Sequence, residues 1–85
     1  MNALLRFIET PPLPLRKTKS WNVYSAHGGE LLGFVYWYCA WRRYVFNPVA
    51  QTVYDAACLR AAADFCEQAT ADRKAARAAE KAAQP

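Results

Sequence analysis

Apolar and polar residues alternate along the middle of the chain, which is the pattern of β-strands. Three segments carry this alternation, and they read "KSWNVYSA", "ELLGFVYWYC" and "RRYVFN". The "HGG" between the first two segments supplies the positive φ that tight hairpin turns require. A second turn at "CAW" separates the last two, and Pro48 ends the third because it has no backbone donor. The pattern predicts a three-stranded antiparallel meander.

After Pro48 the apolar residues recur every three or four positions, which is the period of an amphipathic helix. Thr52 is predicted as the N-cap, since Asp55 follows three residues later in a weak capping box. The apolar face of this helix comprises Cys58, Leu59, Ala62, Phe65, Cys66 and Ala69. That face needs a sheet to cover it. We therefore expect an α+β fold, a three-stranded antiparallel meander packed by one C-terminal helix.

A proline-rich arm, residues 1–19, precedes the predicted α+β domain of residues 20–69. Residues 1–9 are mildly apolar and could add an edge strand or a short helical turn. The prolines of "PPLP" then favour the polyproline II conformation. The spacing Pro11-x-x-Pro14-x-Arg16 matches an SH3-domain ligand, but a stiff arm leading into the first strand is the simpler interpretation.

The C-terminal tail, residues 70–85, is rich in alanine and is expected to be helical or frayed. Arg73, Arg77 and Lys81 recur every four residues and form a basic ridge along it. The tail carries no large apolar stripe, and an isolated helix of this length is marginal in water. We therefore expect a chain cut after Thr70 to keep its thermal midpoint.

Residues 31–46 hold seven aromatic residues, more than one helix can cover. Because side chains alternate along a strand, the aromatic residues divide between the two faces of the sheet. The predicted core face comprises Val35, Trp37, Cys39, Val45, Trp21 and Val23. The opposite face comprises Phe34, Tyr36, Tyr38, Tyr44 and Arg42. Trp37 is thus predicted to be buried and Tyr36 to be exposed.

The sequence leaves the register of the first two strands open. A two-residue turn would pair Trp21 with Tyr36, and a three-residue turn would pair it with Val35. A slip of one residue moves every side chain to the other face.

Positive charge is concentrated in the first half of the chain. Residues 1–47 carry six basic and two acidic residues, whereas residues 48–85 carry five of each, so the first half holds the net charge of +4. This charge is either ordinary solubility charge or the mark of an anionic partner, nucleic acid or an acidic protein surface. Aromatic and basic side chains together are typical of binding surfaces. The candidate binding residues are Arg42, Arg43, Tyr36, Tyr38, Tyr44, Lys17 and Lys19.

The sequence offers little for catalysis or for metal binding. Cys39, Cys58 and Cys66 form no CxxC motif, and His27 has no second ligand nearby, so we expect no metal, no cofactor and no catalytic site. The thiols are expected to be reduced, as in a cytoplasm. The longest apolar run has eleven residues, too few to span a membrane, and no signal peptide is visible. "GFVYW" shares part of the RRM signature, but the order of elements does not fit that fold.

The chain resembles a set of small uncharacterised phage and prophage accessory proteins. The shared pattern is K-T-K-x-W-x-V, G-x-x-L-G-x-V-x-W-Y, W-R-x-Y-x-F-x-P and T-V-Y-D-x-x-C-L, and it covers residues 17–65. The alanine-rich tail departs from the pattern.

The resemblance implies a phage protein of the bacterial host cytoplasm. It would be a non-enzymatic binding protein that inhibits or redirects a host complex, for example a CRISPR–Cas or other defence system. Its partner would then be a host protein or ribonucleoprotein complex. The alternative is a small nucleic-acid-binding protein that uses the same basic aromatic face.

Overall fold

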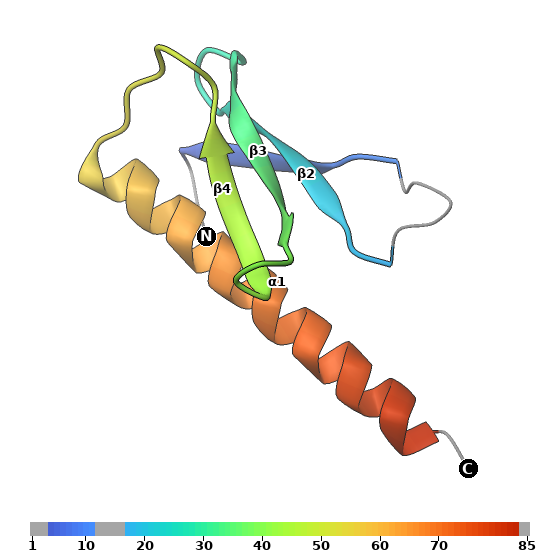
Figure 1. Cartoon of the computed structure of the whole chain (residues 1–85). Helices are drawn as coiled ribbons and strands as arrows, with labels where there is room; N and C mark the ends of the chain where they lie inside the picture. Colours follow the sequence, from blue (N-terminus) through green and yellow to red (C-terminus); the bar gives the residue numbers. More distant parts are fainter. Residues whose placement is uncertain (1–3, 12–16, 84–85) are drawn as a thin grey trace.

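In residues 4–11 and 17–83, which the computed structural model describes, four antiparallel strands lie against one long helix (Figure 1). The strand order follows the sequence, and the helix packs mainly against the last strand. The elements are β1 (Leu5–Glu9), β2 (Ser20–Ser25), β3 (Leu31–Tyr38), β4 (Arg43–Pro48) and α1 (Ala56–Ala83). Pro14 and Arg16 of the possible SH3 ligand lie outside the described residues.

The prediction of three strands was wrong by one, because residues 5–9 form an edge strand. This strand pairs with β2, with Leu5 opposite Ser25 and Glu9 opposite Trp21. Its alternate residues Leu5 and Phe7 point to the core, where Leu5 is buried. The edge strand that the sequence left open for residues 1–9 therefore forms.

The register between β2 and β3 places Trp21 opposite Val35, the second of the two pairings that the sequence left open. Val23 lies opposite Gly33, and both are buried. Gly33 is required there, because a Cβ atom would lie 2.6 Å from the carbonyl oxygen of Asn47 and 2.8 Å from the ring of Phe46. This face of the sheet carries the core.

The predicted positions of Tyr44, Val45 and Cys39 were wrong. Tyr44 is only 5% exposed and lies opposite Trp37, on the core face. Val45 lies opposite Tyr36 on the outer face, and Cys39 is exposed in the turn after β3. The reason is the turn at residues 39–42, because Arg42 has a φ of 53° and lies outside β4.

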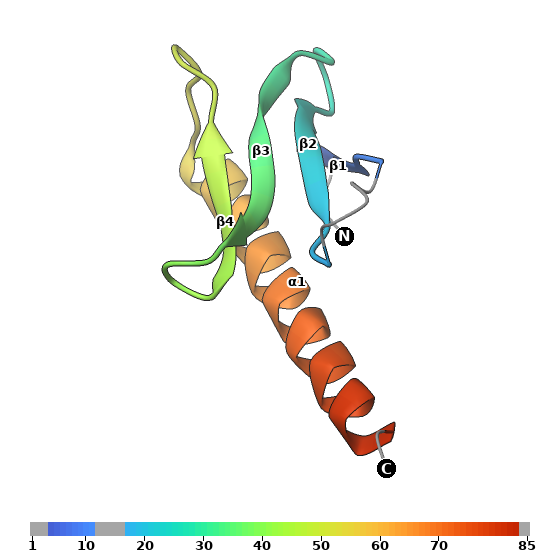
Figure 2. The ribbon, with the colours of Figure 1, turned by 45° about the vertical axis from the view of Figure 1, so that its right-hand side comes forward.

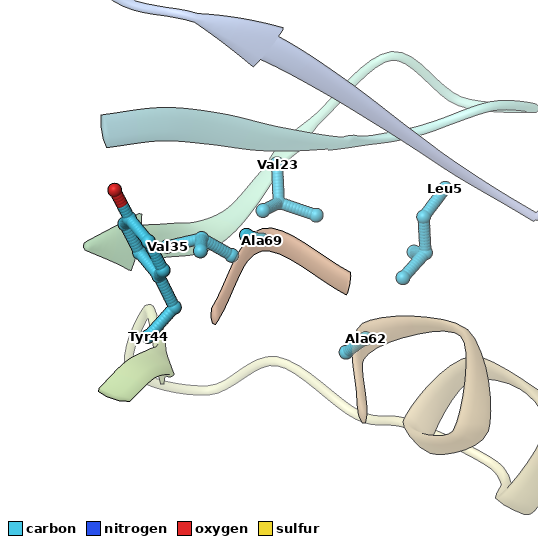
Figure 3. Close-up of a cluster of buried hydrophobic side chains, with 6 residues drawn as sticks. All are labelled: Leu5, Val23, Val35, Tyr44, Ala62 and Ala69. Carbon is cyan, nitrogen blue, oxygen red and sulfur yellow. The ribbon is translucent and has the colours of Figure 1, made fainter. Parts of the chain in front are cut away.

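The buried core is small and is drawn from every layer of the fold (Figure 3). Trp37 packs against it, as predicted for its face, although Trp37 and Tyr36 are both half-buried. The core residues are Leu5, Val23, Val35, Tyr44, Ala62 and Ala69.

The helix begins one turn later than the capping box predicted. The backbone N–H of Cys58 donates to Asp55 Oδ1 at 2.9 Å, so Asp55 and not Thr52 is the N-cap. This hydrogen bond to the carboxylate lowers the pKa of Asp55. The hydroxyl of Thr52 instead donates to the carbonyl oxygen of Val49 at 2.7 Å.

The helix docks through small residues and one aromatic ring. Ala62 and Ala69 are buried, so the helix backbone comes close to the sheet. The ring of Phe65 stacks on Phe7 with 3.9 Å between centroids. Leu59, predicted on the same face, is 53% exposed and does not belong to it.

Residues 70–83 of the alanine-rich tail continue α1 without a break, and this half of the helix extends beyond the sheet (Figures 1 and 2). The guanidinium carbon of Arg73 lies 4.9 Å from the centroid of the Trp37 ring, within cation–π range. One residue of the basic ridge is therefore tied to the sheet. No helix among the described residues combines the length and the apolar character needed to cross a membrane.

Candidate functional site

An open groove of about 930 Å³ lies between residues 65–81 of α1 and the chain that leads into β2. Among the residues that the structure describes, five cations line it against two carboxylates, Asp72 and Glu80. The groove therefore holds a local excess of positive charge, in a chain whose total net charge is +4. The five cations are Lys17, Lys19, Arg73, Arg77 and Lys81.

Helical spacing places three of the five cations along one side of the groove. Residues four apart in a helix lie on one face, so Arg73, Arg77 and Lys81 follow each other along α1. The side chain of Arg73 is half-buried, and those of Arg77 and Lys81 are exposed. This side of the groove is a rigid row of positive charge.

The opposite side of the groove is formed by the segment that enters β2. The backbone N–H of Lys19 donates to the hydroxyl of Tyr44 at 3.1 Å, which fixes this segment above the core. The Nζ of Lys19 lies 4.0 Å from Glu9 Oε1, and both side chains are well exposed. An exposed pair at this distance is weak, so the Lys19 ammonium remains able to bind an anion.

Aromatic rings form the floor of the groove. Trp21 lies edge-on to Tyr44 at 5.4 Å and to Phe65 at 5.0 Å, measured between ring centroids. All three rings are buried or half-buried. The contact of Trp21 with Phe65 joins the sheet to the helix, and the five cations line the same groove as these rings.

A second, smaller hollow of about 390 Å³ lies on the other flank of α1. Its cations are Arg42, Arg43 and Lys74, with Glu67 as the one carboxylate among its described residues. Tyr44 lines both hollows, and its backbone N–H donates to the Thr70 hydroxyl oxygen at 3.0 Å. This bond ties the free edge of β4 to the middle of α1.

Both hollows lie at one end of the sheet. The strands are antiparallel, so β2 and β4 begin where β3 ends. Figure 2 shows the turn between β3 and β4 beside the middle of α1, near the end of the sheet from which the helix projects. Basic side chains from three separate segments therefore gather around residues 67–81.

The structure does not gather the predicted binding residues on one sheet face. Lys17 and Lys19 line the groove, whereas Arg42 and Arg43 line the second hollow. Tyr44 is buried between the two hollows. The other two, Tyr36 and Tyr38, belong to the outer face, where the hydroxyl of Tyr36 accepts a hydrogen bond from Asn47 Nδ2 at 3.3 Å.

The binding residues predicted from the sequence did not include the basic ridge of α1 or Trp41, which the structure places at the same end of the sheet as the two hollows. Arg73, Arg77 and Lys81 were recognised as a ridge, and their four-residue period was the signal, but they were assigned to solvent. Trp41 was assigned only to a turn, yet it is 64% exposed beside two arginines. A tryptophan in a short turn is the signal that could have singled it out.

Among the described residues, metal-ligand clusters are absent and two of the three cysteines are weak nucleophiles. No group of three or more histidine, cysteine or acidic residues comes together in the described part of the chain. Burial raises the pKa of the Cys66 thiol to about 11, and the hydrogen bond to Asp55 raises the pKa of Cys58. Both thiols are therefore protonated at neutral pH and are poor nucleophiles.

Three comparisons with known proteins found no significant match to the chain, whether among protein-family models, curated proteins or solved structures. The resemblance to phage and prophage accessory proteins therefore stays a prediction. The charge and the geometry of the two hollows are the features of the molecule that bear on its function.

Proposed function

We propose that this protein is a non-enzymatic binding protein whose groove holds the phosphate backbone of a nucleic acid. The observation that carries the proposal is the convergence of five cations from two distant segments on one open groove. Three of these cations repeat along α1 at about 6 Å intervals, four residues at 1.5 Å per residue. That interval is close to the spacing of successive phosphates along a strand, so a row of contacts is possible.

The openness of the groove favours a polymer over a small molecule. Small-molecule sites are mostly apolar and enclose their ligand. Here the groove is bordered by exposed Lys17, Lys19, Arg77 and Lys81, whose ammonium and guanidinium groups remain hydrated. Contacts of this kind supply affinity through the release of counterions and carry no sequence preference.

The first test is a titration of fluorescein-labelled single-stranded and duplex DNA and RNA at two salt concentrations. The groove variant is the double substitution Arg77→Gln and Lys81→Gln. Its matched control is Arg6→Gln with Arg60→Gln, because Arg6 and Arg60 are exposed, lie outside both hollows and carry the same charge. Each double variant lowers the net charge from +4 to +2.

We expect the groove variant to lose about tenfold or more in affinity and the control to lose much less. For single strands, the magnitude of the slope of log affinity against log salt should decrease by about 1.4 in the groove variant, because two phosphate contacts at about 0.7 each are lost. Equal losses in the two variants would mean that only net charge matters, and the groove would then not be the site.

A second candidate function follows from the outer face of the sheet. Within the described residues, α1 covers only one face of the sheet. Three apolar side chains are exposed on or beside the other face, namely Ile8, Leu31 and Phe34, and Phe34 is 39% exposed. We propose, as this second candidate, that the chain is a phage protein of the bacterial host cytoplasm that inhibits a host complex through this face. Exposed apolar side chains that share one sheet face can contribute to a protein interface.

The second candidate predicts a phenotype in bacteria that carry a CRISPR–Cas system. Expression of the protein is expected to restore plaques of a targeted phage, and Phe34→Asp is expected to abolish this effect. Val53→Asp is the control, because Val53 is 91% exposed and lies outside the sheet. Failure of the wild type to restore plaques would contradict inhibition through this face. Equal restoration by Phe34→Asp and Val53→Asp would contradict it as well.

A further inference from the structure

The turn between β3 and β4 presents an exposed tryptophan at the basic end of the molecule. Trp41 is 64% exposed, whereas tryptophan residues are on average well buried in proteins. It takes no part in the core cluster. A function outside the core would explain why so large an apolar side chain stands in a four-residue turn.

The turn holds Trp41 in a defined position. The backbone N–H groups of Trp41 and Arg42 both donate to the carbonyl oxygen of Tyr38, at 3.2 and 2.9 Å. The side-chain Nε of Arg43 donates to the carbonyl oxygen of Trp41 at 3.2 Å. Arg42 adopts the left-handed region, at φ 53°, which few residues other than glycine do. A ring on such a turn loses little freedom when it binds.

The ring of Trp41 keeps a face available for a ligand. It meets the ring of Tyr38 at 84°, with 5.0 Å between centroids. An edge-to-face contact of this kind covers at most one face of either ring. The remaining ring surface is open to solvent, as the exposure of Trp41 requires.

The charges around Trp41 select the ligand. Arg42 and Arg43 adjoin it in sequence and line the second hollow together with Lys74. Glu67 is the one carboxylate among the described residues of that hollow. An exposed ring followed directly by two cations suits a ligand that alternates planar bases with phosphates.

We propose that the ligand is a single-stranded nucleic acid and that Trp41 stacks on one of its unpaired bases. This inference rests on the proposed function and specifies its substrate class. A duplex offers phosphates to the cations of both hollows but hides the faces of its bases within the stack. A single strand offers both, so Trp41 should distinguish the two.

The experiment compares Trp41→Leu with Val53→Ala in binding to a labelled 20-nucleotide thymidine strand and to a 20-base-pair duplex. Both substitutions shorten an exposed apolar side chain, but Val53 lies outside the sheet and lines neither hollow. Trp41→Leu should weaken single-strand binding by about tenfold and leave duplex binding and the salt slope unchanged. Trp41→Phe should recover most of the loss, and Val53→Ala should behave as the wild type.

The outcomes separate this inference from the proposed function. Nucleic-acid binding that is salt-dependent but indifferent to Trp41→Leu would overturn base stacking and leave the groove proposal standing. Equal losses for single strand and duplex would also overturn it, because the turn would then act through position or charge. If the wild type binds neither nucleic acid, the proposed function is wrong, and the inference is wrong with it.

Discussion

Replacing Phe65 with alanine is expected to lower the free energy of unfolding by about 3 kcal/mol or more. The 28-residue helix contains only two large apolar residues, Leu59 and Phe65, and Leu59 is mostly exposed. Phe65 stacks on Phe7 from β1 and lies edge-on to Trp21 from β2. Without its ring, the apolar residues of α1 that remain at the core are Ala61, Ala62, Cys66 and Ala69, which bury little area.

This loss would be a large share of the total stability. A chain of 85 residues at about 0.05–0.15 kcal/mol per residue has about 4–13 kcal/mol in all. Urea unfolding followed by tryptophan fluorescence measures the change, because Trp21 contacts the deleted ring. At the lower end of that range only about 1 kcal/mol would remain, and part of the variant would be unfolded in buffer.

Leu59→Ala is the matched control for Phe65→Ala. It removes a large apolar side chain from the same helix, but Leu59 is 53% exposed, so we expect a loss of less than about 1 kcal/mol. A loss from Leu59→Ala as large as that from Phe65→Ala would mean that the helix docks through a different face.

Local patterns were sufficient to predict the element types of most of this fold. The period of three to four residues after Pro48 located a helix whose buried positions include Ala62 and Ala69. The alternation in residues 31–38 located β3 and placed Val35 and Trp37 on the core side. In both cases the signal lies within one segment, where a period of 3.6 or 2 can be read directly.

The relation between segments could not be read in this way. Tyr44 and Val45 were assigned to the wrong faces because the length of the turn before β4 sets their register. That turn depends on Arg42 in a left-handed conformation, which its residue type does not indicate. β1 was equally uncertain, since its pairing partner lies beyond a proline-rich segment and its own alternation is short.

The candidate site shows the same division. The charges of Lys17 and Lys19 and the ridge of Arg73, Arg77 and Lys81 were each visible in the sequence. Their meeting was not, because it depends on how α1 crosses the sheet and how far it extends past it. A surface built from residues more than 50 positions apart has no local pattern that would reveal it.

A chain that ends at Asp72 should separate folding from binding, with the largest effect on binding of all the changes considered. It lacks four cations, Arg73, Lys74, Arg77 and Lys81, and it keeps Thr70, which accepts the N–H of Tyr44. We expect single-strand affinity at low salt to fall by about 100-fold or more, with a salt slope lower by up to about 2.8, from four contacts at about 0.7 each.

The same truncation should change stability only modestly. The folding contact among described side chains that it removes is that of Arg73 with Trp37, which is worth about 0.5–2 kcal/mol. One kcal/mol shifts the thermal midpoint of a domain this size by about 4–8 °C. The full retention expected from sequence for a cut after Thr70 is therefore revised to a small decrease, measured by circular dichroism on heating.

A full-length variant with all four of these cations replaced by glutamine is the control for helix length. If charge alone matters, this variant should bind as weakly as the truncated chain, and its helix content should match the wild type. A truncated chain that still binds as tightly as the wild type would remove the groove as the site. A quadruple variant that binds normally while the truncated chain does not would show that the helix backbone, and not its row of cations, makes the contact. The expected agreement of the two variants follows from the geometry of the two hollows. Among the described residues, α1 contributes three of the five cations of the groove and, with Lys74, one cation of the second hollow.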